Sequence, residues 1–392
     1  MEHKTRIKGN VHYVGVNDRN KHRFEGMWPL PYGVSYNSYL IDDEMVALVD
    51  TVDICYFEVY LRKIKQVIGE RPINYLIINH MEPDHSGSIR LIKQHYPEII
   101  IVGNKQTFGM IEGFYGVTGE QYLVKEGDFL ALGHHKLRFY MTPMVHWPET
   151  MMTFDETDGV LFSGDGFGCF GTVDGGFLDT RINVDKYWGE MVRYYSNIVG
   201  KYGSPVQKAL QKLGGLPISA ICSTHGPVWT ENIAKVIGIY DRLSRYDADE
   251  GVVIAYGSMY GNTEQMAEAI AEELSAQGVK NIVMHNVTKS HPSYIIADIF
   301  RYKGLIIGSP TYSNQIFPEV EALLSKILLR EVKGRYLGYF GSFTWAGAAV
   351  KRLAEFAEKS KFELVGDPVE MKQAMKDLTY TQCENLARAM AD

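Results

Sequence analysis

The second part of the chain, from about residue 251 to the end, alternates short apolar runs with amphipathic segments. The apolar runs are VVIAY, NIVMHNV, GLIIG, RYLGYFG and FELVGD. In the segments between them, apolar residues recur at helical spacing, as Met266, Ile270 and Leu274 do in EQMAEAIAEELSAQG. Five strands that alternate with five helices predict a doubly wound parallel α/β sheet over residues 251–392.

Residues 1–250 follow a different pattern, in which strand-like runs are separated by turns and only a few helical stretches. These runs are HYVGV, GVSYNSYLI, MVALVD, INYLIIN, EIIIVG, KLRFYMT, TMMTF and GVLFSGD. The pattern predicts stacked sheets with helices on their outer faces. The boundary between domains 1–250 and 251–392 is expected near DRLSRYDADEG, where a helical stretch gives way to a charged segment.

Composition supports a globular protein of more than one domain, with 392 residues, 45% of them hydrophobic and 22% charged. A net charge of −7 and the lack of a long basic run argue against a nucleic-acid partner. The segment MEHKTRIKGN lacks the apolar core of a signal peptide, and no apolar run is long enough for a membrane span. We therefore expect a cytoplasmic protein with no membrane contact. The 4 cysteines form no C-x-x-C pair, which argues against a disulfide framework and a thiolate metal site.

Imidazoles and carboxylates directly follow several of the apolar runs. They are His80, Glu82, Asp84 and His85 after INYLIIN, and His146, Asp165 and His225 after three later runs. Any one of them alone is usually a turn residue. Together they exceed what one metal ion accommodates, so we expect two ions that share a carboxylate. The set has no thiolate, and its oxygen donors suit iron or manganese as well as zinc.

These residues resemble the metallo-β-lactamase superfamily, whose hydrolases typically show H-x-H-x-D-H at this strand end. In this chain the second histidine is replaced by Glu82. The H-x-E-x-D-H form resembles the flavodiiron branch of that superfamily, in which the centre is non-haem iron and the chemistry is redox. The exchange of a neutral imidazole for an anion helps to hold a site that reaches the diferric state.

Three loops that follow strands of the predicted parallel sheet carry small, hydroxyl-bearing and aromatic residues. The first loop precedes a helix and directs N–H groups and hydroxyls at an anion. It lacks the lysine of a nucleotide triphosphatase loop and the G-x-G-x-x-G of dinucleotide binding. Ligands of doubly wound sheets bind where such loops meet, and Tyr312 and Trp345 offer faces or edges to a flat ring. Together the loops resemble flavodoxin, which implies FMN bound by Ser258, Met259, Tyr260, Gly261, Asn262, Thr263, Ser309, Pro310, Thr311, Tyr312, Asn314, Ser342, Phe343, Thr344, Trp345, Ala346 and Gly347.

Taken together, the two halves resemble the flavodiiron proteins (A-type flavoproteins, the rubredoxin:oxygen and nitric oxide oxidoreductase family) over nearly the whole chain. The resemblance implies a metallo-β-lactamase-like αββα sandwich followed by a flavodoxin-like domain. It also implies one iron on His80, Glu82 and His146, a second on Asp84, His85 and His225, and Asp165 as the bridge. In some members the histidine at the position of His85 turns away from the metal.

Two further residues are candidates for supporting the centre. Tyr195 resembles a family tyrosine whose phenol donates a hydrogen bond or proton to a bound oxygen species, although a packing role suits a chain with 25 tyrosines equally well. Asp50, in VALVDT, is a candidate for orienting a ligand histidine, and its alternative role is that of an ordinary turn residue.

The resemblance implies a reductase of dioxygen to water, of nitric oxide to nitrous oxide, or of both. A diferrous pair and a flavin hydroquinone hold the four electrons that dioxygen needs, whereas coupling two nitric oxide molecules takes two. The lack of C-x-x-C pairs argues against a fused rubredoxin, so the donor is expected to be a separate rubredoxin-like protein or a reduced deazaflavin coenzyme.

Family members form head-to-tail homodimers, or dimers of such dimers, that bring the flavin of one subunit close to the iron of the other. Two other functions stay open at this point. One is a zinc-dependent hydrolase with an attached flavodoxin domain. The other is an electron carrier whose first domain is structural.

Overall fold

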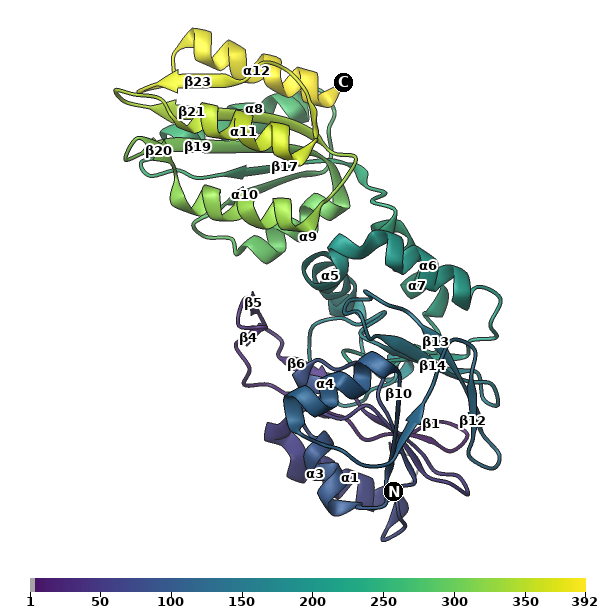
Figure 1. Ribbon diagram of the computed structural model, residues 1–392. Coiled ribbons are helices and arrows are strands. Elements are labelled where there is room, and N and C mark those ends of the chain that lie inside the picture. Colours follow the sequence, from purple (N-terminus) through teal and green to yellow (C-terminus); the bar gives the residue numbers. More distant parts are fainter. Residues whose placement is uncertain (1–3) are drawn as a thin grey trace. The chain divides into compact units, whose positions relative to one another are not determined.

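The computed structural model describes residues 4–392, so the first three residues of the segment inspected for a signal peptide lie outside the description. The chain divides into two compact units, one ending at Ser244 and the other comprising Arg245–Asp392. In Figure 1 the first unit runs from purple to teal and the second from green to yellow. Among residues 4–392, no helix combines the length and the apolar character required to cross a membrane.

The first unit contains a mixed sheet of 7 strands in the order β1-β2-β7-β8-β9-β10-β11. Parallel pairing joins β8, β9, β10 and β11, whereas the strands from β1 to β8 pair antiparallel. The strands are β1 (Arg6–Lys8), β2 (Val11–Tyr13), β7 (Tyr39–Ile41), β8 (Ala47–Val49), β9 (Tyr75–Ile77), β10 (Ile100–Gly103) and β11 (Gln121–Leu123).

A second sheet of 5 strands has the order β12-β13-β14-β15-β16. Its strands are β12 (Phe129–Ala131), β13 (Lys136–Met141), β14 (Met151–Asp155), β15 (Val160–Gly164) and β16 (Ala220–Ser223). One buried core includes Val49 and Ile77 of the first sheet together with Phe139 and Phe162 of the second, so the two sheets pack face to face. Burial of both inner faces is the main source of stability of such a sandwich.

Helices cover the outer faces of this sandwich, which completes the expected αββα arrangement. They are α1 (Phe57–Ile68), α3 (Ile89–His95) and α4 (Lys105–Tyr115) on one side in Figure 1, and α5 (Asp185–Tyr194), α6 (Gly203–Leu213) and α7 (Ile233–Ser244) on another. Two small ribbons, β3 (Val16–Asp18) with β6 (Val34–Tyr36) and β4 (Arg23–Phe24) with β5 (Trp28–Pro29), lie outside the two sheets.

The second unit is the predicted doubly wound sheet, with the order β18-β17-β19-β21-β22 and with β23 also paired to β21. Its strands are β17 (Asp249–Tyr256), β18 (Ile282–Asn286), β19 (Tyr302–Tyr312), β21 (Tyr336–Phe343), β22 (Glu363–Leu364) and β23 (Val369–Lys372). Its helices are α8 (Asn262–Ala276), α9 (Pro292–Arg301), α10 (Pro318–Arg330), α11 (Ala349–Ser360) and α12 (Asp377–Ala391). In chain order this is the 2-1-3-4-5 arrangement of flavodoxin-like sheets.

The fifth strand position differs from the sequence expectation. The run FELVGD contributes only the two residues of β22, whereas the four residues of β23 lie beyond it in the chain and extend the pairing with β21. Val369 and Met371 alternate with exposed residues and point into the core, which is the usual pattern of a strand with one solvated face.

Candidate metal centre and flavin site

The predicted metal ligands all lie just beyond the carboxyl ends of strands of the sandwich. His80 follows β9, His146 lies in the loop between β13 and β14, Asp165 follows β15, and His225 follows β16. Glu82 precedes the short helix α2 (Pro83–Ser86), which carries Asp84 and His85. A turn of helix therefore presents Asp84 and His85.

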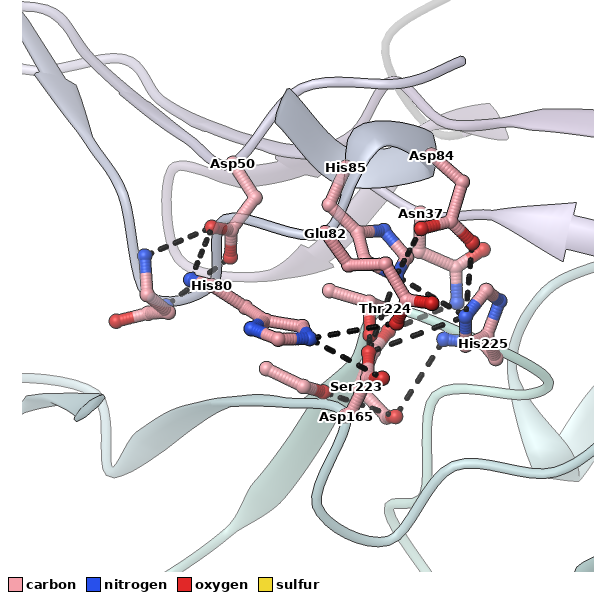
Figure 2. A network of polar contacts seen from close by, with 12 residues as sticks. Asn37, Asp50, His80, Glu82, Asp84, His85, Asp165, Ser223, Thr224 and His225 are labelled. Carbon is pink, nitrogen blue, oxygen red and sulfur yellow. Dashed lines mark hydrogen bonds and ion pairs between the residues drawn. The ribbon is translucent and has the colours of Figure 1, made fainter. Parts of the chain in front are cut away.

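The structure brings the seven side chains into two neighbouring groups, each with ligand atoms within 4.8 Å of one another. The groups are His80, Glu82, His146 and Asp165, and Asp84, His85 and His225. Asp165 belongs to both in its geometry: its Oδ2 lies 3.0 Å from His146 Nε2, and its Oδ1 lies 3.0 Å from His85 Nε2. Figure 2 shows Asp165 between His80 on one side and His225 on the other. A carboxylate placed in this way can bridge two cations.

Two of the imidazoles are oriented by groups behind them. The Nδ1 atom of His80 lies 2.8 Å from Oε1 of the fully buried Glu149, which also accepts the backbone N–H of Met81. The Nδ1 atom of His225 lies 2.7 Å from the carbonyl oxygen of Ser35. Both contacts leave Nε2 facing the cluster, which is the arrangement that metal-bound histidines need.

Asp50 supports the centre through the backbone and not through an imidazole. Its Oδ1 accepts the backbone N–H of Asn79 at 2.8 Å and that of His80 at 3.3 Å, as the left of Figure 2 shows. Burial raises the pKa of Asp50 to about 6, in spite of the lowering effect of His85. Asp50 thus holds the end of β9 from which His80 projects.

The charges of the cluster fit cations. Burial, and then the negative charge of Glu82, raises the pKa of Asp84 to about 8. Both oxygens of Asp84 and Nε2 of His80 are buried and have no hydrogen-bond partner among residues 4–392. Three buried carboxylates and unpartnered nitrogens carry a large desolvation cost, which bound metal ions would offset. The donor set therefore fits two metal ions.

His85 faces the cluster. Its Nε2 lies 3.0 Å from Nε2 of His225 and 3.4 Å from Oδ1 of Asp84. Two imidazole nitrogens that point at one place from two loops are suited to share a cation. In this structure Nε2 of His85 therefore points into the cluster, and its role as a ligand remains a prediction.

The tyrosines next to the centre differ in their surroundings. Tyr195 packs edge-on against Tyr240 at 5.0 Å between ring centroids. The ring of Tyr194 lies 5.6 Å from that of His225, and burial and then the charge of Asp165 raise its pKa well above the usual value. Its buried hydroxyl has no hydrogen-bond partner among the described residues. Tyr194 is therefore a phenol beside the metal ligands.

Sequence reasoning missed Glu149 and Tyr194. A signal existed for Glu149, because it follows His146 by three residues in HWPET and is the next carboxylate on that loop. No local signal separated Tyr194 from Tyr195, since they are adjacent and equally buried.

The three predicted flavin loops meet at the carboxyl end of the second sheet. Thr263 Oγ1 of the first loop lies 2.8 Å from Ser342 Oγ of the third. Thr311 Oγ1 of the second loop accepts backbone N–H groups of Ala348 and Ala349 beyond the third. The loops leave β17, β19 and β21, and β17 is the strand at which the order of the sheet reverses. This is the place where doubly wound sheets bind ligands.

The first loop is shaped for an anion. Ser258 Oγ accepts the backbone N–H of Gly261, whose φ of +89° favours glycine, and helix α8 begins at the next residue, Asn262. This places the helix N-terminus and hydroxyls together, as a phosphate requires.

The three loops carry large aromatic side chains that are exposed to solvent. Tyr260 is 90% exposed, Trp345 79% and Tyr312 48%. Ser313 and Asn314 both have positive φ and form the two-residue turn between β19 and β20 (Gln315–Ile316). The remaining predicted contacts are exposed residues of the loop surface, one half-buried residue and two buried residues. The exposed residues are Met259, Asn262, Asn314, Thr344, Ala346 and Gly347, Phe343 is half-buried, and Ser309 and Pro310 are buried within β19.

Comparisons with known proteins identify both halves. A family model described as "ODP family beta lactamase" matches residues 34–226, and the flavodoxin model matches residues 254–385. The anaerobic nitric oxide reductase flavorubredoxin of Vibrio vulnificus is 32% identical over 363 residues, which cover 91% of this chain and 73% of that protein.

Solved structures agree with this. The rubredoxin oxygen:oxidoreductase of Desulfovibrio gigas has a TM-score of 0.95 at 31% identity and covers 99% of this chain and 97% of its own. The flavodiiron protein of Giardia intestinalis has a TM-score of 0.92 at 27% identity and covers 97% and 94%.

Proposed function

The chain belongs to the flavodiiron proteins, and from this premise we propose that it reduces dioxygen to water, nitric oxide to nitrous oxide, or both, at a diiron centre. Membership of this family makes it an oxidoreductase. The flavodoxin domain indicates FMN as one cofactor, and the diiron centre of the family is the other. The proposal assigns the iron to the domain over residues 1–250 and FMN to the domain over residues 251–392.

The observation that carries the proposal is the placement of Asp165. Its two oxygens face two separate groups of imidazoles and carboxylates, with Oδ2 toward His146 and Oδ1 toward His85. A site for one metal ion does not need a carboxylate whose two oxygens face two separate groups of ligands. Glu82 adds an anionic donor where a hydrolase of the superfamily has a neutral imidazole, and this favours iron that cycles between oxidation states.

We assign one iron to His80, Glu82 and His146, the other to Asp84, His85 and His225, and the bridge to Asp165. When bound, this centre supplies the electrons that reduce the diatomic substrate. Around it, Glu149 and the carbonyl of Ser35 hold the imidazoles of His80 and His225 in orientation. Tyr194 presents a buried hydroxyl beside Asp165 that is suited to donate a hydrogen bond to the substrate. The role that the family resemblance suggested for Tyr195, donation of a hydrogen bond or proton by its phenol, remains a prediction.

FMN is proposed to bind the three loops, with its phosphate at the N-terminus of α8 and its ring among Tyr260, Tyr312 and Trp345. Electrons are proposed to come from a rubredoxin-type carrier, because relatives are named flavorubredoxin and rubredoxin oxygen:oxidoreductase. A reduced deazaflavin coenzyme is the second candidate. We propose a head-to-tail homodimer, or a dimer of such dimers, in which the FMN of one subunit serves the iron of the other.

The test is rapid mixing of the anaerobically reduced protein, with its iron and FMN quantified, with dioxygen and separately with nitric oxide. Flavin and iron absorbance are followed over a single turnover. Fast and complete oxidation by one gas, with slow or self-inactivating reaction with the other, assigns the substrate.

Oxidation by neither gas contradicts the proposal. Purified protein with zinc and without iron would then support the metallo-β-lactamase-like hydrolase. Reversible flavin reduction without catalytic turnover would support the electron carrier.

A further inference from the structure

The ring of His225 is enclosed by aromatic side chains from segments outside the two sheets. Its centroid lies 5.2 Å from that of Phe24, which meets it edge-on, and 5.6 Å from that of Tyr194. His225 is fully buried and Phe24 is 2% exposed. Phe24 belongs to β4, whereas Tyr194 ends α5. The ribbon formed by β4 and β5 therefore supplies part of the wall around the candidate metal centre.

This ribbon, defined here as residues 22–30, has one buried and one exposed face. Phe24 and Trp28 pair across the two strands and are 2% and 1% exposed, whereas Arg23, which pairs with Pro29, is exposed. Side chains that pair across two strands lie on the same face, so the buried face is the one that carries Phe24. A two-stranded ribbon is only marginally stable alone. Its position therefore depends on contacts with the rest of the unit.

Arg193 of α5 makes such contacts. Its Nη1 donates a hydrogen bond to the carbonyl oxygen of Pro29 at 3.0 Å. Its Cζ lies 4.5 Å from the ring centroid of Phe170, and that ring lies 5.4 Å from the ring of Phe24. Arg193 thus contacts the ribbon directly and also supports, through Phe170, the ring that covers His225.

Arg193 is held in this orientation by a buried ion pair. The side chain is 2% exposed, and its Nε donates to Oε2 of Glu190 at 3.1 Å. Glu190 lies one helical turn earlier on α5, and its side chain is 9% exposed. A buried ion pair adds little net stability compared with apolar residues of similar volume. The pair is better explained by what it orients, which is a guanidinium with an N–H group directed at Pro29.

We propose that the ribbon of residues 22–30 is a cover over the His225 side of the metal centre, and that Arg193 is the positioning residue that keeps it closed. The cover retains the metal ion assigned to Asp84, His85 and His225 and keeps chelating anions from solvent away from it. Arg193 takes no part in the chemistry and acts only through the position of the ribbon. This inference rests on the proposed function, because the ligand set is part of it.

The first experiment measures metal release and needs no turnover. The full chain with FMN is loaded with zinc, and an excess of a chromophoric chelator reports the release of zinc with time. The test variant is Arg193→Met with Glu190→Gln, because Arg193→Met alone would leave a buried carboxylate unpaired. The control is Gln207→Met, which removes the contacts of Gln207 Nε2 between α6 and α7, with Asp241 Oδ1 at 2.9 Å and Ser244 Oγ at 2.7 Å.

The wild type should bind two zinc ions per chain and release both slowly. In the double variant, one of the two ions should leave at least about tenfold faster, because a hydrogen bond from a charged group contributes about that much. The other ion, and both ions of the control, should keep the wild-type rates. Equal release from the double variant and the wild type overturns the cover and leaves the proposed function standing. Fewer than two zinc ions in the wild type would contradict the ligand assignment, and the cover would fall with it.

The second experiment uses the zinc-loaded wild type alone. The backbone N–H groups of Met27 and Leu30 donate to the carbonyl oxygens of Phe24 and His22, so their hydrogen exchange reports opening of the ribbon. Zinc release and the exchange of these two amides should rise with the same slope in low concentrations of urea, because both require the same local opening. Amides that pair β14 with β15 should not follow this slope. A different slope for zinc release overturns the cover, even if the double variant does not fold.

Discussion

Replacing Glu149 should weaken metal binding although Glu149 is not one of the proposed ligands. This carboxylate is fully buried and uses one oxygen, Oε1, for two contacts of 2.8 Å, to Nδ1 of His80 and to the backbone N–H of Met81. Burial opposes the ionisation of Glu149, but the contact with His80 outweighs it and lowers the pKa. The carboxylate thereby fixes which nitrogen of His80 carries the proton and leaves Nε2 for the metal.

The magnitude follows from these contacts. Loss of a group that orients a ligand histidine typically lowers metal affinity about 10- to 100-fold, or about 1.4–2.8 kcal/mol. Glu149→Ala removes both contacts and should lie at the upper end of this range. Glu149→Gln keeps one oxygen that can accept from His80 and Met81. It replaces Oε2, which has no hydrogen-bond partner among residues 4–392, with an amide N–H₂. We therefore expect about a 10-fold loss of metal affinity.

The assay is competition between the apo-protein and a chromophoric chelator for ferrous iron under anaerobic conditions. Asp179→Asn is the matched control, because Asp179 is a buried carboxylate of the same unit that accepts the backbone N–H of Thr230 at 3.0 Å and belongs to none of the candidate metal groups among the described residues. The control should alter stability and leave the affinity for iron unchanged. Unchanged affinity in a folded Glu149→Ala protein would refute the reasoning, as would an equal loss in the control.

Three further predictions concern the two cofactor sites and stability. Glu82→Ala should lower the iron content and abolish reductase activity while FMN stays bound; iron analysis, flavin absorbance and gas consumption check this, and unchanged activity contradicts the ligand assignment. Trp345→Ala, which removes a side chain that is 79% exposed beside the flavin loops, should weaken FMN binding or shift the flavin potential without loss of iron; loss of iron in this variant would argue against separate sites. Burial lowers the pKa of His135, but its hydrogen bond with Asp155 outweighs this and raises it. Stability from the charged pair should therefore be complete below the unfolded pKa of about 6.5 and disappear as the pH rises through the folded value. Urea unfolding at several pH values should show the gap between wild type and Asp155→Asn narrowing as the pH rises, and a gap that widens would contradict the assignment.

Much of the fold follows from local pattern. The alternation of apolar runs and amphipathic helices over residues 251–392 determines a parallel sheet, because helical crossovers bury both of its faces. The exception is the fifth strand, where the run FELVGD is apolar enough to predict a strand but only Glu363 and Leu364 pair with β21. Pairing of β23 depends on where the chain returns to the sheet, which no local pattern encodes.

The candidate ligands could be predicted because imidazoles and carboxylates directly follow several apolar strands. Together they are more metal-binding side chains than one metal ion accommodates. Tertiary structure alone decided that one oxygen of Asp165 faces His146 and the other faces His85, since the four loops approach one another only after the two sheets pack. The direction of His85, which the sequence left open, has the same cause.

Support for the ligands was the least predictable part. Asp50 and Glu149 are both carboxylates near His80, and only the packed structure places Asp50 on its backbone and Glu149 on its imidazole. Tyr194 and Tyr195 are neighbours in sequence, yet the end of α5 turns one ring toward His225 and the other toward Tyr240. The sequence by itself therefore determined which chemical groups are present and at which strand ends. The tertiary structure decided which of them face one another, because side-chain direction at a helix or strand end depends on packing between segments far apart in the chain.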